Sequence, residues 1–241
     1  MIFGKGIDFQ VYNEELSKQL LNVLNSKEEN LLIGICLHYK QLDLKRFNHN
    51  SRIYYKEFAK YYRFQLARIL KNKLYFSSSI TRFYSDYKPN HNVTDYIQKL
   101  KKIWDKKDVV IIEGQKTRLG VGNNLFDNMN SIERIICPIK NAFNTIKTII
   151  NTIKIKVSIN KLILISLGPT ATVLAYDLYK LGYRVIDIGH ADIEYEWFLR
   201  KAKNKMGIIN KYVNESPEKF TANTKVMDKN YYRQIIAEIL D

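Results

Sequence analysis

The sequence predicts an α/β protein whose doubly wound, mainly parallel sheet is flanked by helices. In its second half, short aliphatic runs of strand length alternate with segments whose apolar residues recur at helical spacing. The strand-like runs end in glycine or polar loops, as strands buried in a parallel sheet do. Hydrophobic residues make up 46% of the 241-residue chain, which is ample for a core. We expect one domain over residues 1–241, with a less regular half (1–105), a regular core (106–203) and a tail (204–241).

The amino-terminal half begins with short elements. Residues 1–9 include two glycines and can form little more than a strand or hairpin fragment. A stripe of leucines then predicts a helix over 13–25, which Asn13 can cap. Residues 31–37 are apolar and predict a buried strand.

Residues 43–72 are rich in aromatic and basic side chains and allow two interpretations. Interleaved aromatics and cations can stack on single-stranded nucleic acid and neutralise it. Helical spacing favours instead a helix that faces the core; the residues at that spacing are Phe58, Tyr61, Tyr62, Leu66 and Ile69. Beyond it, residues 77–83 predict a loop or short strand, and 93–104 predict an amphipathic helix.

The regular core begins with an aliphatic run over 108–114 that ends in Glu-Gly and predicts a strand. A glycine-bearing loop over 118–127 then runs into a predicted helix. A second strand is predicted over 134–137 and a helix over 141–153.

The clearest β-α-β unit follows. Its first strand, 162–167, is closed by Gly-Pro, and Thr170 can cap the next helix. Gly182 ends that helix, and 184–188 returns as a second strand. Two further helices are predicted, over 194–203 and 230–240.

The chain is strongly basic, with 39 Lys and Arg against 24 Asp and Glu and a formal net charge of +15. This charge suits a polyanion or an anionic membrane surface, but the basic residues are spread along the chain, which disfavours nucleic-acid binding. Cys36 and Cys137 lie in apolar runs and predict buried, reduced thiols. Neither a signal peptide nor a membrane-spanning run is visible, so we expect a cytoplasmic protein.

Two loops of the β-α-β unit predict a ligand site, because ligands of parallel sheets bind outside the carboxyl ends of the strands. Residues 168–170 offer the free N–H groups of a helix start, which attract phosphate. Asp192 and Glu194, two residues apart, would project from one face of an extended stretch and could share a divalent cation. The alternative is a helix start with acids in its first turn. His190 would lie on the same side.

No glycine-rich dinucleotide fingerprint or P-loop is present, so a hydride-transfer or P-loop enzyme is disfavoured. The loop over 118–124, which contains Gly120 and Gly122, could wrap a nucleotide or sugar. Arg118 or Arg82 could meet a diphosphate with two parallel hydrogen bonds. An ordinary turn with a solvated arginine is the alternative.

The residues resemble the GT-D-type bacterial glycosyltransferases. The segments that carry the resemblance are 79–83, 113–114 with 118–127, 134–143, 167–177 and 187–197. The likeness extends from about Gly4 to Trp197, and its last two segments are long and specific. It implies a Rossmann-like fold with a nucleotide-sugar-binding core over 106–203.

The resemblance also implies an activity: transfer of a hexose, typically from UDP-glucose, to a growing bacterial glycan. Relatives act in the glycosylation of surface adhesins and in polysaccharide assembly, so the acceptor would be a glycan or glycoprotein. In the family, Asp192 and Glu194 correspond to the pair tied to Mn²⁺ or Mg²⁺. We expect these two residues and His190 to be catalytic, and His190 and Glu113 to be polar partners of sugar or acceptor. The donor site would comprise Arg82, Glu113, Arg118, Gly120, Gly122, Asn123, Asn124, Gly168, Pro169, Thr170 and Thr172.

One departure from the family lies at the amino end, where an Asp-Gly-Glu segment is expected and Phe3 to Gln10 resembles the segment just after it. Either the chain starts late or the motif has decayed. The main alternative function is therefore a weakened or inactive relative that acts as a binding module in a glycosylation complex. A single-stranded nucleic-acid binder is the second alternative.

Overall fold

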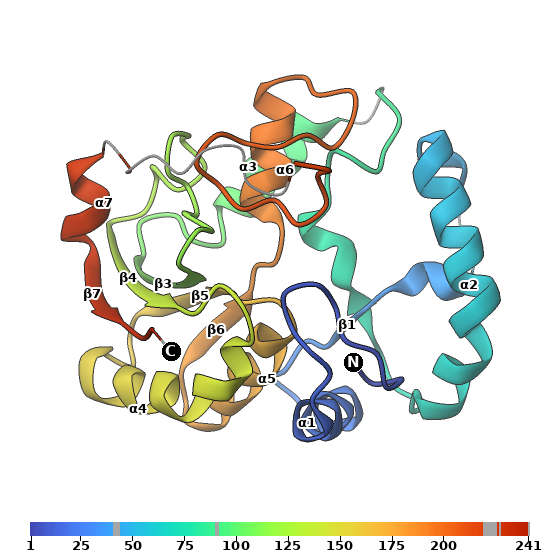
Figure 1. The fold of residues 1–241 in the computed structure, drawn as a ribbon, viewed down its shortest axis with the longest axis horizontal. Helices are drawn as coiled ribbons and strands as arrows, with labels where there is room; N and C mark the ends of the chain where they lie inside the picture. Colours follow the sequence, from blue (N-terminus) through green and yellow to red (C-terminus); the bar gives the residue numbers. More distant parts are fainter. Residues whose placement is uncertain (41–43, 90–91, 219–225, 227, 241) are drawn as a thin grey trace.

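The computed structural model describes residues 1–40, 44–89, 92–218, 226 and 228–240. Its centre is a five-stranded parallel sheet with the strand order β6-β5-β3-β4-β7 (Figure 1). The predicted α/β fold with a parallel sheet is thus confirmed. The strands are β3 (Asp108–Gly114), β4 (Ser131–Cys137), β5 (Leu162–Ser166), β6 (Arg184–Asp187) and β7 (Ile235–Glu238).

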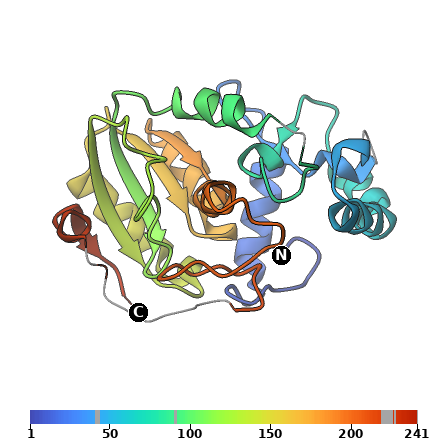
Figure 2. The ribbon, with the colours of Figure 1, turned by 90° about the horizontal axis from the view of Figure 1, so that it is seen from above.

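Helices cover both faces of the sheet, as Figure 2 shows from above. Alternate side chains of a strand point to opposite faces, so Val110 and Ile112 of β3 pack with one helix layer while Val109 and Ile111 pack with the other. All four are fully buried. The first layer comprises α1 (Glu14–Asn25), α4 (Ile146–Lys156) and α5 (Pro169–Lys180), and the second comprises α3 (Val93–Lys101) and α6 (Ala191–Leu199).

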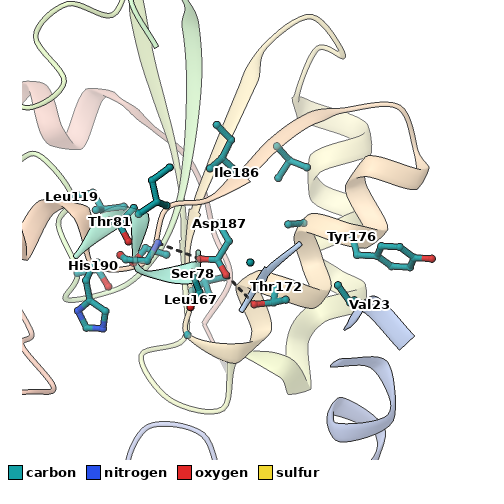
Figure 3. A pocket seen from close by; sticks show the side chains of 18 of the residues that line it. Val23, Ser78, Thr81, Leu119, Leu167, Thr172, Tyr176, Ile186, Asp187 and His190 are labelled. Atoms are coloured by element: carbon teal, nitrogen blue, oxygen red, sulfur yellow. Dashed lines mark hydrogen bonds between the residues drawn. The ribbon is translucent and has the colours of Figure 1, made fainter. Parts of the chain in front are cut away.

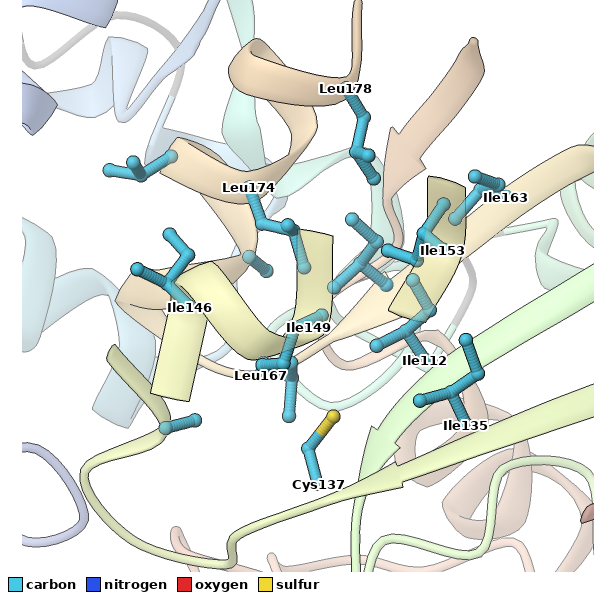
Figure 4. Packing of buried hydrophobic residues seen from close by; sticks show 14 of the residues in the cluster. Ile112, Ile135, Cys137, Ile146, Ile149, Ile153, Ile163, Leu167, Leu174 and Leu178 are labelled. Atoms are coloured by element: carbon cyan, nitrogen blue, oxygen red, sulfur yellow. The ribbon is translucent and has the colours of Figure 1, made fainter. Parts of the chain in front are cut away.

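The larger core lies between β3, β4 and β5 and the layer of α4 and α5 (Figure 4). Ile149 and Ile153 of α4, four residues apart, point from one face of the helix into this core, where Leu174 and Leu178 of α5 meet them. All four are fully buried. Because burial of such a side chain stabilises a fold by about 1.5–3 kcal/mol, this layer holds the sheet in place.

The amino-terminal half contributes α1 and α3 to the two helix layers, and α2 and several short elements lie between them in the chain. The helix α1 confirms the leucine stripe, with the Asn13 side chain accepting a hydrogen bond from Leu16 N. The strand predicted over 31–37 is only the two-residue β1 (Gly34–Ile35), which pairs in parallel with β2 (Phe76–Ser77).

The helix α2 (His49–Ile69) stands at the end of the molecule opposite α7 (Figures 1 and 2). It confirms the predicted helix, but the expectation that its regularly spaced apolar residues all face a core is wrong. Tyr55 and Ala59 are buried, whereas Tyr61 is 65% exposed. The reason is that α2 packs mainly on short 3₁₀ segments, η1 (Leu37–Lys40) and η2 (Leu44–Arg46), instead of a sheet.

The tail differs most from expectation. The helix predicted over 230–240 is a short helix, α7 (Lys229–Arg233), followed by the strand β7. The β-branched run at 235–236 pairs with the edge of β4, and Ile239 N donates to Ile136 O at 2.8 Å. Further tail residues, Ile208 and Val213, are buried against Trp197. The described residues of the tail therefore supply one strand of the sheet and part of a buried cluster.

Several boundaries inside the core also differ. α5 is capped by Gly168, and Thr170 is a buried residue of its first turn instead of the cap. The loop over 118–127 does not continue into a helix but forms successive turns. α6 begins at Ala191, three residues before the predicted start at Glu194. Among the described residues, no helix has both the length and the apolar character needed to cross a membrane.

Candidate functional site: a cleft at the carboxyl ends of the strands

A cleft of about 1040 Å³ opens at the carboxyl ends of β3, β5 and β6. Residues at or just after the ends of these strands line it, among them Gly114, Leu167 and Gly189. Leu167 and Asp187 are labelled in Figure 3. The chain after β3 passes over the α6 face of the sheet, whereas α5 after β5 covers the opposite face. Connections that diverge in this way leave a crevice between neighbouring strand ends, where ligands of such sheets bind.

The amino terminus of α5 forms one wall of this cleft. Gly168, its cap, has φ 56° and ψ −141°, and a Cβ at this position would lie 2.2 Å from the ring of Phe9. Only glycine fits here, because the left-handed φ and the close approach both disfavour a side chain. Pro169 follows at the start of the helix, where its missing N–H costs nothing.

The two predicted loops do lie side by side, since Ser166 Oγ donates to Gly189 O at 3.2 Å. Thr170 and Thr172 have different places. Thr170 is buried and donates to Gln10 Oε1 at 3.4 Å; Gln10 lines the cleft, whereas Thr170 does not. Thr172 lines the cleft.

Asp187, at the end of β6, is a cleft residue that the sequence interpretation missed. Thr172 Oγ1 donates to its Oδ2 at 2.9 Å, and Gly189 N donates to its Oδ1 at 3.2 Å (Figure 3). The carboxylate opens into the cleft but has no cation in contact among its described partners. Partial desolvation by the surrounding cleft raises the pKa of Asp187 to about 6. The sequence did contain a signal for this residue, because a carboxylate near the end of a predicted parallel strand is well placed to face a ligand.

Arg82 and His190 also line the cleft, and both meet Glu215. Arg82 follows the 3₁₀ segment η3 (Ser78–Thr81), and its Nη1 donates to Glu215 Oε2 at 3.0 Å while Nη2 donates to Oε1. His190 Nε2 is 3.5 Å from Glu215 Oε1. Burial and the nearby charge of Arg82 lower the pKa of His190 to about 4, so this imidazole is neutral at pH 7.

Asp192 lines the cleft, but both of its carboxylate oxygens already accept hydrogen bonds from the protein. Its Oδ1 accepts hydrogen bonds from Gly120 N at 2.9 Å and Asn123 Nδ2 at 2.8 Å. Its Oδ2 is 2.7 Å from Lys211 Nζ, and the residue is 1% exposed. Asp192 therefore holds both the loop after β3 and the segment around Lys211 against α6.

Glu194 is fully buried and faces another direction. Its Oε2 accepts from Tyr84 N at 2.8 Å and Ser85 N at 2.7 Å, and its Oε1 accepts from Ser85 Oγ at 2.6 Å. Burial raises the pKa of this carboxyl group. Glu194 thus anchors the segment after η3.

The expectation that Asp192 and Glu194 share one face is wrong, because both belong to the helix α6, in which residues two apart point about 200° apart. All four of their carboxylate oxygens accept hydrogen bonds from the protein. Within the described ranges, no group of three or more His, Cys, Asp and Glu side chains could hold a metal ion. A cation shared by these two carboxylates does not fit this arrangement.

Glu113 is likewise fully buried instead of reaching the cleft. Arg134 Nη1 donates to its Oε1 at 2.6 Å, and Leu119 N donates to its Oε2 at 2.6 Å. Arg134 Nη2 also donates to Leu119 O at 2.9 Å. Burial raises the pKa of Glu113. This pair fixes the loop after β3, so the predicted contact of Glu113 with a sugar is not supported.

The rest of that loop packs on α6 and the tail. Asn123 Nδ2 donates to Glu196 Oε1 at 2.7 Å, Tyr195 OH donates to Asn124 Oδ1 at 2.6 Å, and Arg118 Nη1 donates to Asn210 O at 2.8 Å. The structure therefore does not bring to the cleft the loop residues Arg118, Gly120, Gly122, Asn123 and Asn124. Instead, Thr117 and Leu119 line it.

Residues 1–216 match the family model of the glycosyltransferase GT-D fold. The chain is 38% identical over 240 residues to the probable glycosyl transferase Gly of Streptococcus gordonii and 36% identical over 242 residues to glycosyltransferase GlyD of Streptococcus pneumoniae serotype 4. These matches cover 99% and 100% of this chain but 35% and 29% of the relatives. The chain thus spans about a third of the length of the curated relatives it matches.

Solved structures agree with these matches. A glycosyltransferase from Streptococcus sanguinis superposes with a TM-score of 0.91 and 33% identity, covering 99% of this chain and 88% of that chain. A domain described as having a distinct glycosyltransferase fold superposes with a TM-score of 0.89 and 37% identity, covering 99% and 85%. The family model, the sequence relatives and the superposed structures agree, and the chain belongs to the GT-D-fold glycosyltransferases.

Proposed function

We propose that the cleft binds a UDP-hexose, with glucose as the expected sugar, and that the protein transfers the hexose to a glycan or glycoprotein acceptor. The observation that carries this proposal is the position of the amino terminus of α5. Its cap residue, Gly168, is exposed and lines the cleft. Backbone N–H groups at a helix start bind phosphate without any charged side chain. Family membership supports a nucleotide-sugar donor.

Arg82 is the side chain best suited to the diphosphate. Its guanidinium lines the cleft and already makes a two-pronged contact with a carboxylate, the geometry that also suits phosphate. Asp187 and Thr172 offer polar atoms for sugar hydroxyls in the same cleft. His190 is neutral at pH 7 and offers a hydrogen-bonding ring.

A requirement for Mn²⁺ or Mg²⁺ stays a prediction. Such a cation would offset the charge that develops on a departing nucleoside diphosphate. Asp192 and Glu194 are occupied by protein donors, so we assign no residue to it. The proposed setting, the cytoplasmic side of an anionic membrane, is supported by the net charge of +15.

The test is calorimetric titration with UDP and UDP-glucose, with and without Mn²⁺. We compare the native protein with Arg82→Gln and, as a control, with Arg63→Gln on exposed α2. A lost charged hydrogen bond is worth about 1.5–3 kcal/mol, so Arg82→Gln should weaken UDP binding roughly 10- to 100-fold. Arg63→Gln should bind as the native protein does.

Release of UDP from UDP-glucose in the presence of acceptor measures turnover. Thermal unfolding of each variant confirms that it is folded. Absence of binding to either ligand, with and without the metal, would contradict the proposal and favour a binding module that keeps the fold without the donor chemistry.

A further inference from the structure

Three basic side chains from separate segments converge on one carboxylate at the wall of the cleft. Arg82 comes from the chain after η3, His190 from the turn between β6 and α6, and Lys205 from the chain after α6. Lys205 Nζ is 2.6 Å from Glu215 Oε2, the oxygen that Arg82 Nη1 also contacts. Glu215 thus receives hydrogen bonds on both oxygens from side chains that would suit an anionic ligand.

This cluster is within reach of a ligand in the cleft. Arg82 and His190 line the cleft, and so do Tyr212 and Asn214, which belong to the same segment as Glu215. The side chains of Arg82 and Glu215 are 24% and 20% exposed. An anion that enters the cleft can therefore approach the same guanidinium that Glu215 occupies.

The charges of the cluster balance. Arg82 and Lys205 are cationic, and Glu215 and Asp86 oppose them; Lys205 Nζ lies 3.5 Å from Asp86 Oδ1. Asp86 is fixed by other partners, because Ser51 Oγ and Tyr55 OH donate to it at 3.0 and 2.7 Å. The described side-chain partners of Glu215 all belong to the basic cluster. A ligand could therefore displace the Glu215 carboxylate from the cluster without breaking described side-chain contacts outside it.

Glu215 can leave by rotation of its side chain. The backbone on either side is held, with Val213 and Ser216 buried and Ser216 N donating to Val213 O at 3.3 Å. A diphosphate added beside Glu215 would meet its negative charge, whereas one that replaces it would face the two cations with only the Asp86 carboxylate nearby.

We propose that Arg82, Lys205 and His190 form the diphosphate subsite of the cleft and that Glu215 is an internal competitor which the ligand displaces. This inference rests on the proposed function, since it names the part of the donor that the cluster binds. Lys205 and Glu215 become specificity-determining residues, and the carboxylate excludes anions that bind the cluster too weakly to displace it.

Calorimetric titration of Glu215→Gln with UDP and with inorganic pyrophosphate tests this inference. A neutral amide competes less well for the two cations, so both ligands should bind about 5- to 10-fold more tightly than to the native protein. Glu133→Gln is the matched control: it makes the same charge change in a side chain that pairs with Lys161. Its affinities should equal those of the native protein.

Two further variants keep the test decisive if Glu215→Gln fails to fold. Glu215→Asp retains the charge but shortens the side chain, and should give a smaller gain in affinity. Lys205→Gln should weaken both ligands about 5- to 10-fold. Lys203→Gln, two residues away on the exposed surface, should leave them unchanged.

The two ligands separate this inference from the proposed function. Tighter pyrophosphate binding by Glu215→Gln without any UDP binding would keep the anion subsite and overturn the nucleotide-sugar function. Unchanged or weaker pyrophosphate binding by Glu215→Gln would overturn the inference whatever UDP does, because Glu215 would then position Arg82 instead of competing for it.

Discussion

Two acids of α6, Asp192 and Glu194, have surroundings opposite to those of two acids outside this helix, Asp187 and Glu215. Asp192 and Glu194 are almost wholly buried and accept hydrogen bonds from three other segments of the chain. Asp187 opens into the cleft, and Glu215 faces the basic cluster at its wall. The first pair holds the walls of the cleft together, and the second pair is placed to meet a ligand.

The difference teaches that nearness to a strand end does not decide what a carboxylate does. The surrounding donors decide it. All four carboxylates accept hydrogen bonds from the protein, but a fully buried one stabilises the fold, whereas a partly exposed one can exchange its protein donors for a ligand. Substitutions in the two groups should therefore separate stability from binding.

The largest effect is expected for Asp192→Ala, which leaves Lys211 buried without its partner. Removal of one member of a buried ion pair costs about 3–5 kcal/mol, and the free energy of unfolding measured in urea should fall by up to that amount. Glu196, whose Oε1 is 3.0 Å from Lys211 Nζ, offsets part of the loss. The reference is Asp187→Ala, which should lose less than about 1 kcal/mol. Equal losses in the two variants would contradict the comparison.

A smaller effect is expected for Glu194→Gln. The amide oxygen still accepts from Tyr84 N and Ser85 N, but the hydrogen bonds lose the assistance of the charge. We expect a loss of about 1–2 kcal/mol in the same urea measurement. The exposed Glu29→Gln serves as the control and should show no change. A variant as stable as the native protein would mean that the charge of Glu194 is not needed.

The smallest effect concerns the pH dependence of stability at Asp187, because this residue is exposed and solvent screens its carboxylate. Its pKa of about 6 in the folded protein lies above the usual value of about 3.9, so the folded state holds the proton more tightly. The stability that this proton contributes is fully present below pH 4 and is lost as the pH rises through about 6. As the pH rises from 4 to 7, the free energy of unfolding of the native protein should therefore fall relative to that of Asp187→Asn. A difference that stays constant from pH 4 to 7 would contradict the assigned shift.

Much of the sheet could be predicted because its signals are local. The runs that became β3 and β5 are continuous and aliphatic, and Gly168 follows the second of them directly, so both the strands and the place of the phosphate-attracting turn follow from neighbouring residues. The adjacency of the loops after β5 and β6 follows from the right-handed crossover.

The features that were missed depend on residues far apart in the chain. β7 is a strand because the edge of β4, about 100 residues earlier, pairs with it. Asp192 and Glu194 point apart because α6 begins three residues earlier than expected, which replaces a two-residue repeat by a helical one. Glu215 meets Arg82 across 133 positions, and no local pattern marks it.

The buried thiol of Cys137 can report how often this fold opens. It lies at the end of β4 inside the main core, fully buried, and its burial raises the pKa to about 12 (Figure 4). The reactive thiolate is therefore almost absent at neutral pH, and a reagent in solution has no path to the sulfur while the layer of α4 is in place. Oxidants and alkylating agents can consume this cysteine only as fast as the sheet opens, so its chemical lifetime records how often the protein unfolds.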